Sequence, residues 1–244
     1  MALDKKIIDL YDEYPHKPLV RRVFLDRLTA LTGSATAAGA ALAALEPNYA
    51  QAQMIAPNDA RIETATVSET IGGVALKGLL ATPKAAGRHP AVIVIHENRG
   101  LNPHIQDITR RMAVDGFLAL GVDFLTPLGG TPQDADAART MFGNLSAEQV
   151  VAQGGAALAF LKGHARGNGK VGAMGFCWGG GAVNRLAVSL PDLGAGVVFY
   201  GVSPRSEDVA SIRAAMQLHY AGRDERINAG VPAYEAALKA ANKR

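Results

Sequence analysis

Residues 170–181 read KVGAMGFCWGGG, and this stretch sets the organisation of the chain. The apolar run Val171–Met174 predicts a short strand, and the apolar segment 182–190 predicts a helix. The single cysteine, Cys177, therefore lies on the turn between a strand and a helix, with a glycine two positions to either side. This is the context of a nucleophile elbow, with cysteine in the place of serine.

The glycines around the turn have a steric reason. Strand and helix approach each other closely at an elbow, so Gly175 and Gly179 are expected where a Cβ would block that approach. The helix that follows would direct its positive end at the sulfur, which predicts a thiolate rather than a thiol at Cys177. The alternative is that Cys177 is a buried structural cysteine in a glycine-rich turn.

The composition is that of a soluble α/β domain with an extension. The chain has 244 residues, of which 48% are hydrophobic and 19% charged, and its net charge is +3. No Lys/Arg cluster is interleaved with aromatic residues, so we expect no nucleic-acid partner. One cysteine excludes an intrachain disulfide. His96-Glu97 lacks a second histidine at zincin spacing, so we expect no metal.

Residues 1–52 carry the pattern of an export signal after a polar N-terminal extension. Arg21-Arg22 precedes an apolar pair, the run Leu28–Leu45 is uncharged and rich in alanine, and 50–52 read as a small-x-small cleavage site. This order predicts the twin-arginine route and a periplasmic or secreted protein. The run is too weakly apolar for a convincing membrane span. The alternative is an alanine-rich helix packed on a cytoplasmic protein. Residues 53–63 are expected to be a linker.

Strands and helices alternate through residues 64–244 after an initial hairpin at Gly72-Gly73. This order predicts a mostly parallel, doubly wound α/β sheet. Strands are expected over 64–68, 74–81, 91–95, 117–122, 171–174, 195–200 and 216–220, the last two buried, and helices over 104–115, 135–141, 146–162 and 231–242.

Functional side chains in such sheets gather beyond the carboxyl ends of the strands. Asp224 follows a strand there in a tight turn, where a carboxylate can orient a histidine; the alternative is a turn or cap residue. An oxyanion would need two N–H donors, for which we expect Trp178, after the cysteine, and Asn98, after strand 91–95.

Glu97 lies one residue before the expected oxyanion donor. Its carboxylate could hold or take the proton of the thiol, or it could pair with Arg99 on the surface. His96 ends a strand and has either a core position or a contact in the site. His219 lies inside an expected buried strand and is predicted to pack in the core.

Together these residues resemble the dienelactone hydrolase family of α/β-hydrolases, also called carboxymethylenebutenolidases. The resemblance covers about residues 64–244 and is strongest over 96–100 (HENRG), 175–180 (GFCWGG) and 221–224 (AGRD). It implies the α/β-hydrolase fold and a cofactor-free hydrolase that acts on small esters or lactones through an acyl-enzyme. In that family the substrates bear a carboxylate that is often held by arginines.

The resemblance also implies roles for individual residues. Cys177 would be the nucleophile, Asp224 the acid of a Cys–His–Asp triad, Glu97 the activator of the thiol, and Trp178 and Asn98 the oxyanion donors. Arg99, with His96 beside it, is the expected substrate contact, and Arg139 is the other arginine that could serve; no motif anchors either arginine.

The triad histidine of the family follows a last strand that this 244-residue sequence does not contain, since it stops just past the preceding helix. Three explanations remain open: a shortened form of an active hydrolase, a second polypeptide that supplies the histidine, or a catalytically silent binding protein that retains the pocket. The missing strand predicts an uncovered sheet edge that favours self-association.

Overall fold

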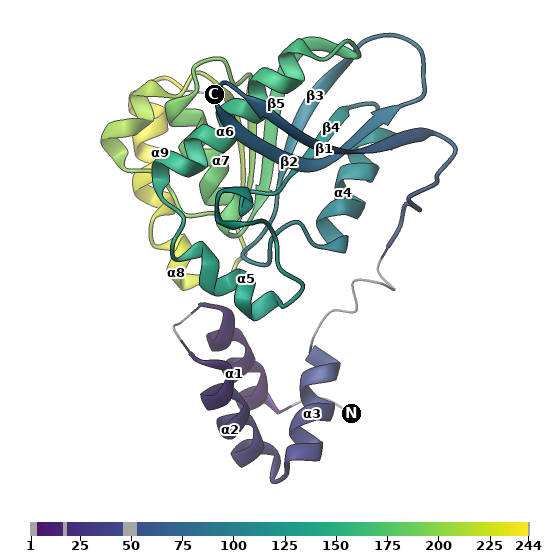
Figure 1. The fold of residues 1–244 in the computed structure, drawn as a ribbon. Helices are drawn as coiled ribbons and strands as arrows, with labels where there is room; N and C mark the ends of the chain where they lie inside the picture. Colours follow the sequence, from purple (N-terminus) through teal and green to yellow (C-terminus); the bar gives the residue numbers. More distant parts are fainter. Residues whose placement is uncertain (1–3, 17–18, 46–52, 244) are drawn as a thin grey trace. The chain divides into compact units, whose positions relative to one another are not determined.

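The computed structural model describes residues 4–16, 19–45 and 53–243 (Figure 1). The chain divides into two units, Met1–Ala52 and Gln53–Arg244, which are described separately.

The first unit consists of three helices, α1 (Lys5–His16), α2 (Arg21–Thr32) and α3 (Ala35–Leu45). Tyr14 of α1 stacks on Phe24 of α2, with ring centroids 4.2 Å apart. The expected polar extension is thus an amphipathic helix, and it packs on the run expected to be an export signal. The core of this unit is formed by Ile7, Leu10, Tyr14, Phe24, Leu28, Ala38, Ala41 and Leu42.

The apolar run of this unit is divided into two helices. Gly33 adopts φ 81° and ends α2, and α3 leaves at an angle of 108°. Among the described residues no single helix is long and apolar enough to cross a membrane, although the bent pair α2–α3 reaches that length and composition. The expected cleavage site at 50–52 lies outside the described residues.

The expected linker is attached to the second unit at its start. Oδ1 of Asp107 accepts hydrogen bonds from the backbone N–H of Met54 (3.1 Å) and Ile55 (2.8 Å). Nε of Arg110 donates to the Ile55 carbonyl at 2.8 Å. Both Asp107 and Arg110 are buried, so this pair fixes the entry of the chain into the domain. The segment then continues into β1, which begins at Ile62.

The second unit contains a seven-stranded sheet with the strand order β1-β2-β4-β3-β5-β6-β7. β1 pairs with β2 and β2 with β4 in antiparallel fashion, and the remaining pairs are parallel. The predicted doubly wound, mostly parallel sheet is confirmed. The strands are β1 (Ile62–Ile71), β2 (Val74–Pro83), β3 (His89–Ile95), β4 (Leu118–Val122), β5 (Gly167–Phe176), β6 (Ala195–Phe199) and β7 (Ala215–His219).

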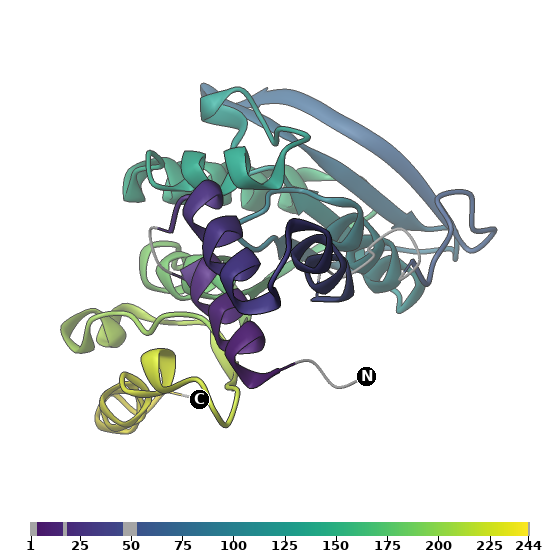
Figure 2. The same ribbon diagram turned by 90° about the horizontal axis from the view of Figure 1, so that it is seen from below.

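The helices of this unit cover the two faces of the sheet unequally. α4 packs with Val92 and Val94 of β3 on one face, and α6 and α7 pack with Ile93 and Ile95 on the other. The helices are α4 (Pro103–Val114), α5 (Ala135–Phe142), α6 (Ala147–Gly163), α7 (Trp178–Ser189), α8 (Glu225–Asn228) and α9 (Val231–Ala240). The β1–β2 hairpin and the α8–α9 segment lie at opposite ends of the domain (Figure 2).

The expectation of a buried last strand is wrong for β7. Its residues alternate between exposed and half-buried positions, because in the described part of the chain β7 is the terminal strand and no element covers its α4 side. His219 is consequently exposed rather than a core residue, and its ring stacks on Phe199 at 4.7 Å. Self-association at this edge stays a prediction.

Candidate active site

The elbow has the predicted backbone. Cys177 lies between β5 and α7 with φ 53° and ψ −114°, a conformation that costs a residue other than glycine about 1–3 kcal/mol. A Cβ on Gly175 would overlap the carbonyl group of Gly179, and one on Gly179 would lie 2.6 Å from the carbonyl oxygen of Ile95. The steric requirement for both glycines is therefore confirmed. The helix begins earlier than expected, at Trp178, so the three glycines form its first turn.

The loop after β6 packs against this first turn. The N–H of Cys177 donates to the carbonyl of Phe199 at 3.0 Å, and a Cβ on Gly180 would meet that same oxygen at 2.6 Å. Tyr200, the next residue, also has a left-handed φ, at 42°. Two neighbouring strand ends thus carry strained residues other than glycine, which is typical of functional sites.

The surroundings of the half-buried Cys177 favour the thiol over the expected thiolate. Burial raises the pKa of the thiol above its ordinary value, and the negative charge of Glu97 and then that of Asp224 act in the same direction. The Trp178 N–H at the helix start and the positive charge of Arg226 lower the pKa. The expected effect of the helix end is present, but loss of hydration outweighs it.

Glu97, Asn98 and Arg99 lie in the loop after β3, following His96, and are half-buried. The charge of Glu97 raises the pKa of the Cys177 thiol, and the role of Glu97 as activator of that thiol stays a prediction. The oxyanion role of Asn98 and the substrate role of Arg99 stay predictions.

His96 does not fit the expected substrate contact. Its side chain is completely buried, Nδ1 donates to the Glu97 carbonyl at 2.7 Å, and Nε2 accepts the N–H of Phe124 at 3.1 Å. Burial lowers the pKa of the ring and keeps it neutral. The imidazole also stacks on Trp178 at 5.7 Å. His96 thus stabilises the backbone at Glu97 through a hydrogen bond and packs against Trp178, the first residue of α7.

Asp224 lies in the turn after β7 and has both of the features weighed for it. Its Oδ1 accepts the N–H of Ile227 at 3.1 Å and caps α8, and its charge also acts on the Cys177 thiol. The cap is observed, whereas the triad role stays a prediction.

Arg226 is the residue that the sequence reasoning missed. It lies two positions after Asp224, and its charge acts on the thiol. The signal available was a cation two positions after the expected acid, on the helix that this acid caps. Arg139, one of the arginines considered, lies on α5 in an ion pair with Asp136 at 3.4 Å. Within the described ranges, no group of three or more His, Cys, Asp or Glu side chains could hold a metal ion.

A mostly parallel sheet with a strained cysteine elbow and carboxylates at neighbouring strand ends defines an α/β-hydrolase. The model of the dienelactone hydrolase family matches residues 76–244, which is more than half of the chain. The chain belongs to the dienelactone hydrolase family and is a hydrolase of ester bonds.

Individual relatives agree with this family. YghX of Escherichia coli K12, described as a hydrolase fragment, is 43% identical over 100 residues, which are 40% of this chain and 86% of that protein. A Synechocystis protein named as a carboxymethylenebutenolidase is 34% identical over 57% of this chain and 59% of its own length. The crystal structure of a protein described as a dienelactone hydrolase from Klebsiella pneumoniae matches with a TM-score of 0.66 and 28% identity, over 75% of this chain and 82% of that one.

Proposed function

We propose that this chain hydrolyses small esters or lactones through an acyl-enzyme formed on Cys177. The observation that carries the proposal is the elbow: a cysteine with a left-handed φ, at the start of a helix, on which the charges of Glu97, Arg226 and Asp224 converge. A structural cysteine has no need of a strained backbone or of three nearby charges.

In the first step the protonated thiol must lose its proton as it attacks. Glu97 accepts the proton, the sulfur bonds to the carbonyl carbon, and the carbonyl oxygen takes up the negative charge. The N–H groups of Trp178 and Asn98 would donate to that oxyanion. Collapse of the intermediate expels the alkoxide, which takes the proton and leaves a thioester on Cys177.

In the second step water attacks the thioester and the free acid is released. By resemblance to the family, a histidine oriented by Asp224 would take the proton of that water. Asp224 supports this role because only Oδ1 forms a hydrogen bond among the described residues, as the cap of α8. The second oxygen remains available to a partner.

The test is hydrolysis of p-nitrophenyl acetate, with the Cys177→Ala variant as the control. Steady turnover that depends on Cys177 supports both steps. A burst of one p-nitrophenolate per chain would mean that acylation occurs without release. Equal rates in the two proteins would contradict the proposal.

A catalytically silent binding protein is the second candidate, and the raised pKa of the Cys177 thiol is the observation that favours it. The pH dependence of alkylation separates the two. In a hydrolase, a substrate analogue should promote formation of the thiolate and so speed up alkylation of Cys177. In a silent binding protein, the thiol should be unreactive both with and without the analogue.

We also propose that the first unit directs export by the twin-arginine route. The boundary between the units, after Ala52, coincides with the end of the expected cleavage pattern, and the Asp107–Arg110 pair holds the chain from Met54 onward. N-terminal sequencing of exported protein should therefore begin near Gln53. An intact N-terminus on mature protein would contradict cleavage there.

A further inference from the structure

Asp123 is a buried carboxylate that the proposed mechanism does not use. It comes directly after β4, and its side chain accepts hydrogen bonds from the N–H of Leu125 (3.1 Å) and the N–H of Thr131 (2.8 Å). Its Oδ1 also accepts the hydroxyl of Thr131 at 2.8 Å. Burying a carboxylate costs free energy unless such donors surround it. Thr131 is eight positions further along the chain, so the carboxylate does more than close the turn after β4.

The Thr131 hydroxyl joins Asp123 to the loop after β3. Because its proton is donated to Asp123, a lone pair of the oxygen is left to accept the N–H of Leu101, at 2.9 Å. Gly100, the residue before Leu101, adopts φ 72°, and a Cβ there would overlap the side chain of Thr131. Thr131 therefore holds the end of this loop both by a hydrogen bond and by close packing.

The start of the same loop is held from the same strand end. Nδ1 of His96 donates to the Glu97 carbonyl at 2.7 Å, and Nε2 accepts the N–H of Phe124 at 3.1 Å. The residues directly after β4 therefore hold the loop 97–101 at both ends, with Glu97 and Asn98 between the two anchors. This arrangement is expected of a loop whose side chains must be placed accurately.

We propose that Asp123 and Thr131 are positioning residues for the reaction at Cys177. Through the N–H of Leu101 they keep the loop 97–101 in one conformation, although neither acts on the reacting atoms itself. The expected proton acceptor and the expected oxyanion donor of the mechanism both lie on that loop. Groups that are already in place need no reorganisation at the moment of reaction. The inference rests on the proposed function in so far as these two loop residues act on the thiol and its substrate.

The test is a double-mutant cycle on the pH profile of Cys177 alkylation by iodoacetamide, a reaction that needs no turnover. Glu97→Gln should lower the apparent pKa of the thiol in the otherwise unmodified protein, because the charge of Glu97 raises it. Thr131→Val keeps a branched side chain of similar size but removes the hydroxyl. In that background the shift caused by Glu97→Gln should be smaller by at least about half, since the loop no longer holds the carboxylate in place. Thr131→Ser, which retains the hydroxyl, should restore the full shift.

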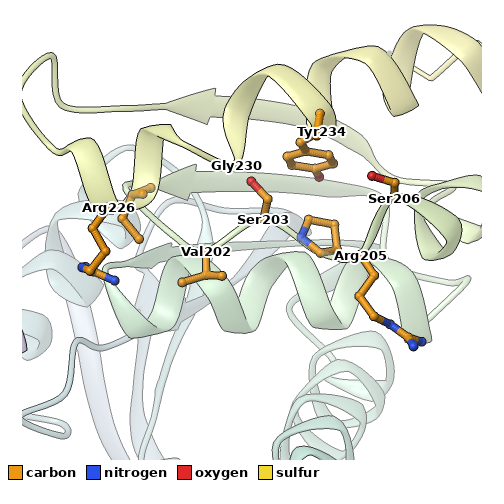
Figure 3. Close-up of a pocket in the computed structure, with 10 residues that line it drawn as sticks. Val202, Ser203, Arg205, Ser206, Arg226, Gly230 and Tyr234 are labelled. Atoms are coloured by element: carbon orange, nitrogen blue, oxygen red, sulfur yellow. The ribbon is translucent and has the colours of Figure 1, made fainter.

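Tyr234→Phe is the matched control for the loss of a buried hydroxyl group. The ring of Tyr234 lines a pocket of about 440 Å³ between the loop after β6 and the helices α8 and α9 (Figure 3). Its hydroxyl donates to Oδ1 of Asn184 at 3.1 Å, a bond between α9 and α7 rather than at the end of β4. The shift caused by Glu97→Gln should therefore be unchanged in this background.

The proposal would be overturned by a Glu97→Gln shift that stays the same in Thr131→Val, or that falls equally in Tyr234→Phe. A shift that is absent already in the unmodified protein would overturn it as well. Hydrolysis separates this proposal from the proposed function. If the cycle gives the predicted coupling but no turnover depends on Cys177, the positioning role stands and the acyl-enzyme is contradicted. If turnover depends on Cys177 and the full shift survives Thr131→Val, the acyl-enzyme is supported and the positioning role is contradicted.

Discussion

The elbow at Cys177 and the turn at Asp224 both follow parallel strands, and both carry a residue expected in catalysis, yet they are held in different ways. The elbow is fixed by backbone on every side, with Gly179 against the carbonyl of Ile95 and the Cys177 N–H bonded to Phe199. The turn at 221–223 is exposed, and the side chain of Asp224 accepts one hydrogen bond, from the N–H of Ile227. Close backbone packing fixes the conformation of the elbow at Cys177. The conformation of the turn at Asp224 depends instead on the groups that bind to its carboxylate.

The largest effect should come from the elbow side of this comparison. Cys177→Ala removes the attacking sulfur atom. We expect kcat to fall by at least about 10⁴-fold, as it does in other enzymes when a nucleophile that acts together with other catalytic residues is removed. Circular dichroism should show an unchanged fold. A loss below tenfold would place the chemistry elsewhere.

Asp224→Asn should cost kcat on the order of 10²- to 10⁴-fold if the carboxylate orients a base. The free energy of unfolding should hardly change, because asparagine caps a helix as well as aspartate does. Both expectations for Asp224→Asn are tested by measuring kcat and the free energy of unfolding of the same variant. If the free energy of unfolding fell while kcat was retained, Asp224 would act only as the cap of α8 and not in catalysis.

Two glycine substitutions test directly how the two turns are held. Gly179→Ala should lower the free energy of unfolding by about 3 kcal/mol, because its Cβ would press on the carbonyl groups of Ile95 and His96. Gly222→Ala, in the Asp224 turn, would meet no atom within 4 Å and should stay within about 0.5 kcal/mol. Urea unfolding of both variants measures the contrast, and equal losses would remove it.

The smallest effects concern the proton on the thiol. Because the charge of Glu97 raises the pKa of Cys177 and that of Arg226 lowers it, Glu97→Gln should move the alkylation profile to lower pH and Arg226→Gln to higher pH. Glu225→Gln serves as the control, since Glu225 is not among the charges that act on the thiol. Shifts in the opposite directions would mean that the thiol is controlled by other groups.

The sequence was sufficient wherever local sterics or periodicity decide the outcome. The Gly72-Gly73 hairpin, the helix that begins after Ser146 and the elbow glycines are found as expected. The burial of β7 could not be predicted, because a short apolar run reads the same whether or not a neighbour covers it. His219 was misplaced for that reason.

The other features of the site depend on burial and on contacts between distant residues, which the spacing of residues in the sequence does not reveal. The helix end at Cys177 indicates a thiolate, but the degree of burial, which only the fold determines, raises the pKa of the thiol instead. His96 looked available in the sequence because the hydrogen bond from the N–H of Phe124 joins residues 28 positions apart. Arg226 was missed because an arginine on a short helix has no motif of its own.

The central claim, a covalent intermediate on Cys177, is tested most directly by trapping it. The protein should be mixed with p-nitrophenyl acetate, quenched in acid within the first turnover, digested and mapped by mass spectrometry. We predict an acetyl thioester on the peptide that contains Cys177. Release of p-nitrophenol without that adduct, or with the acetyl group on another side chain, would contradict the account.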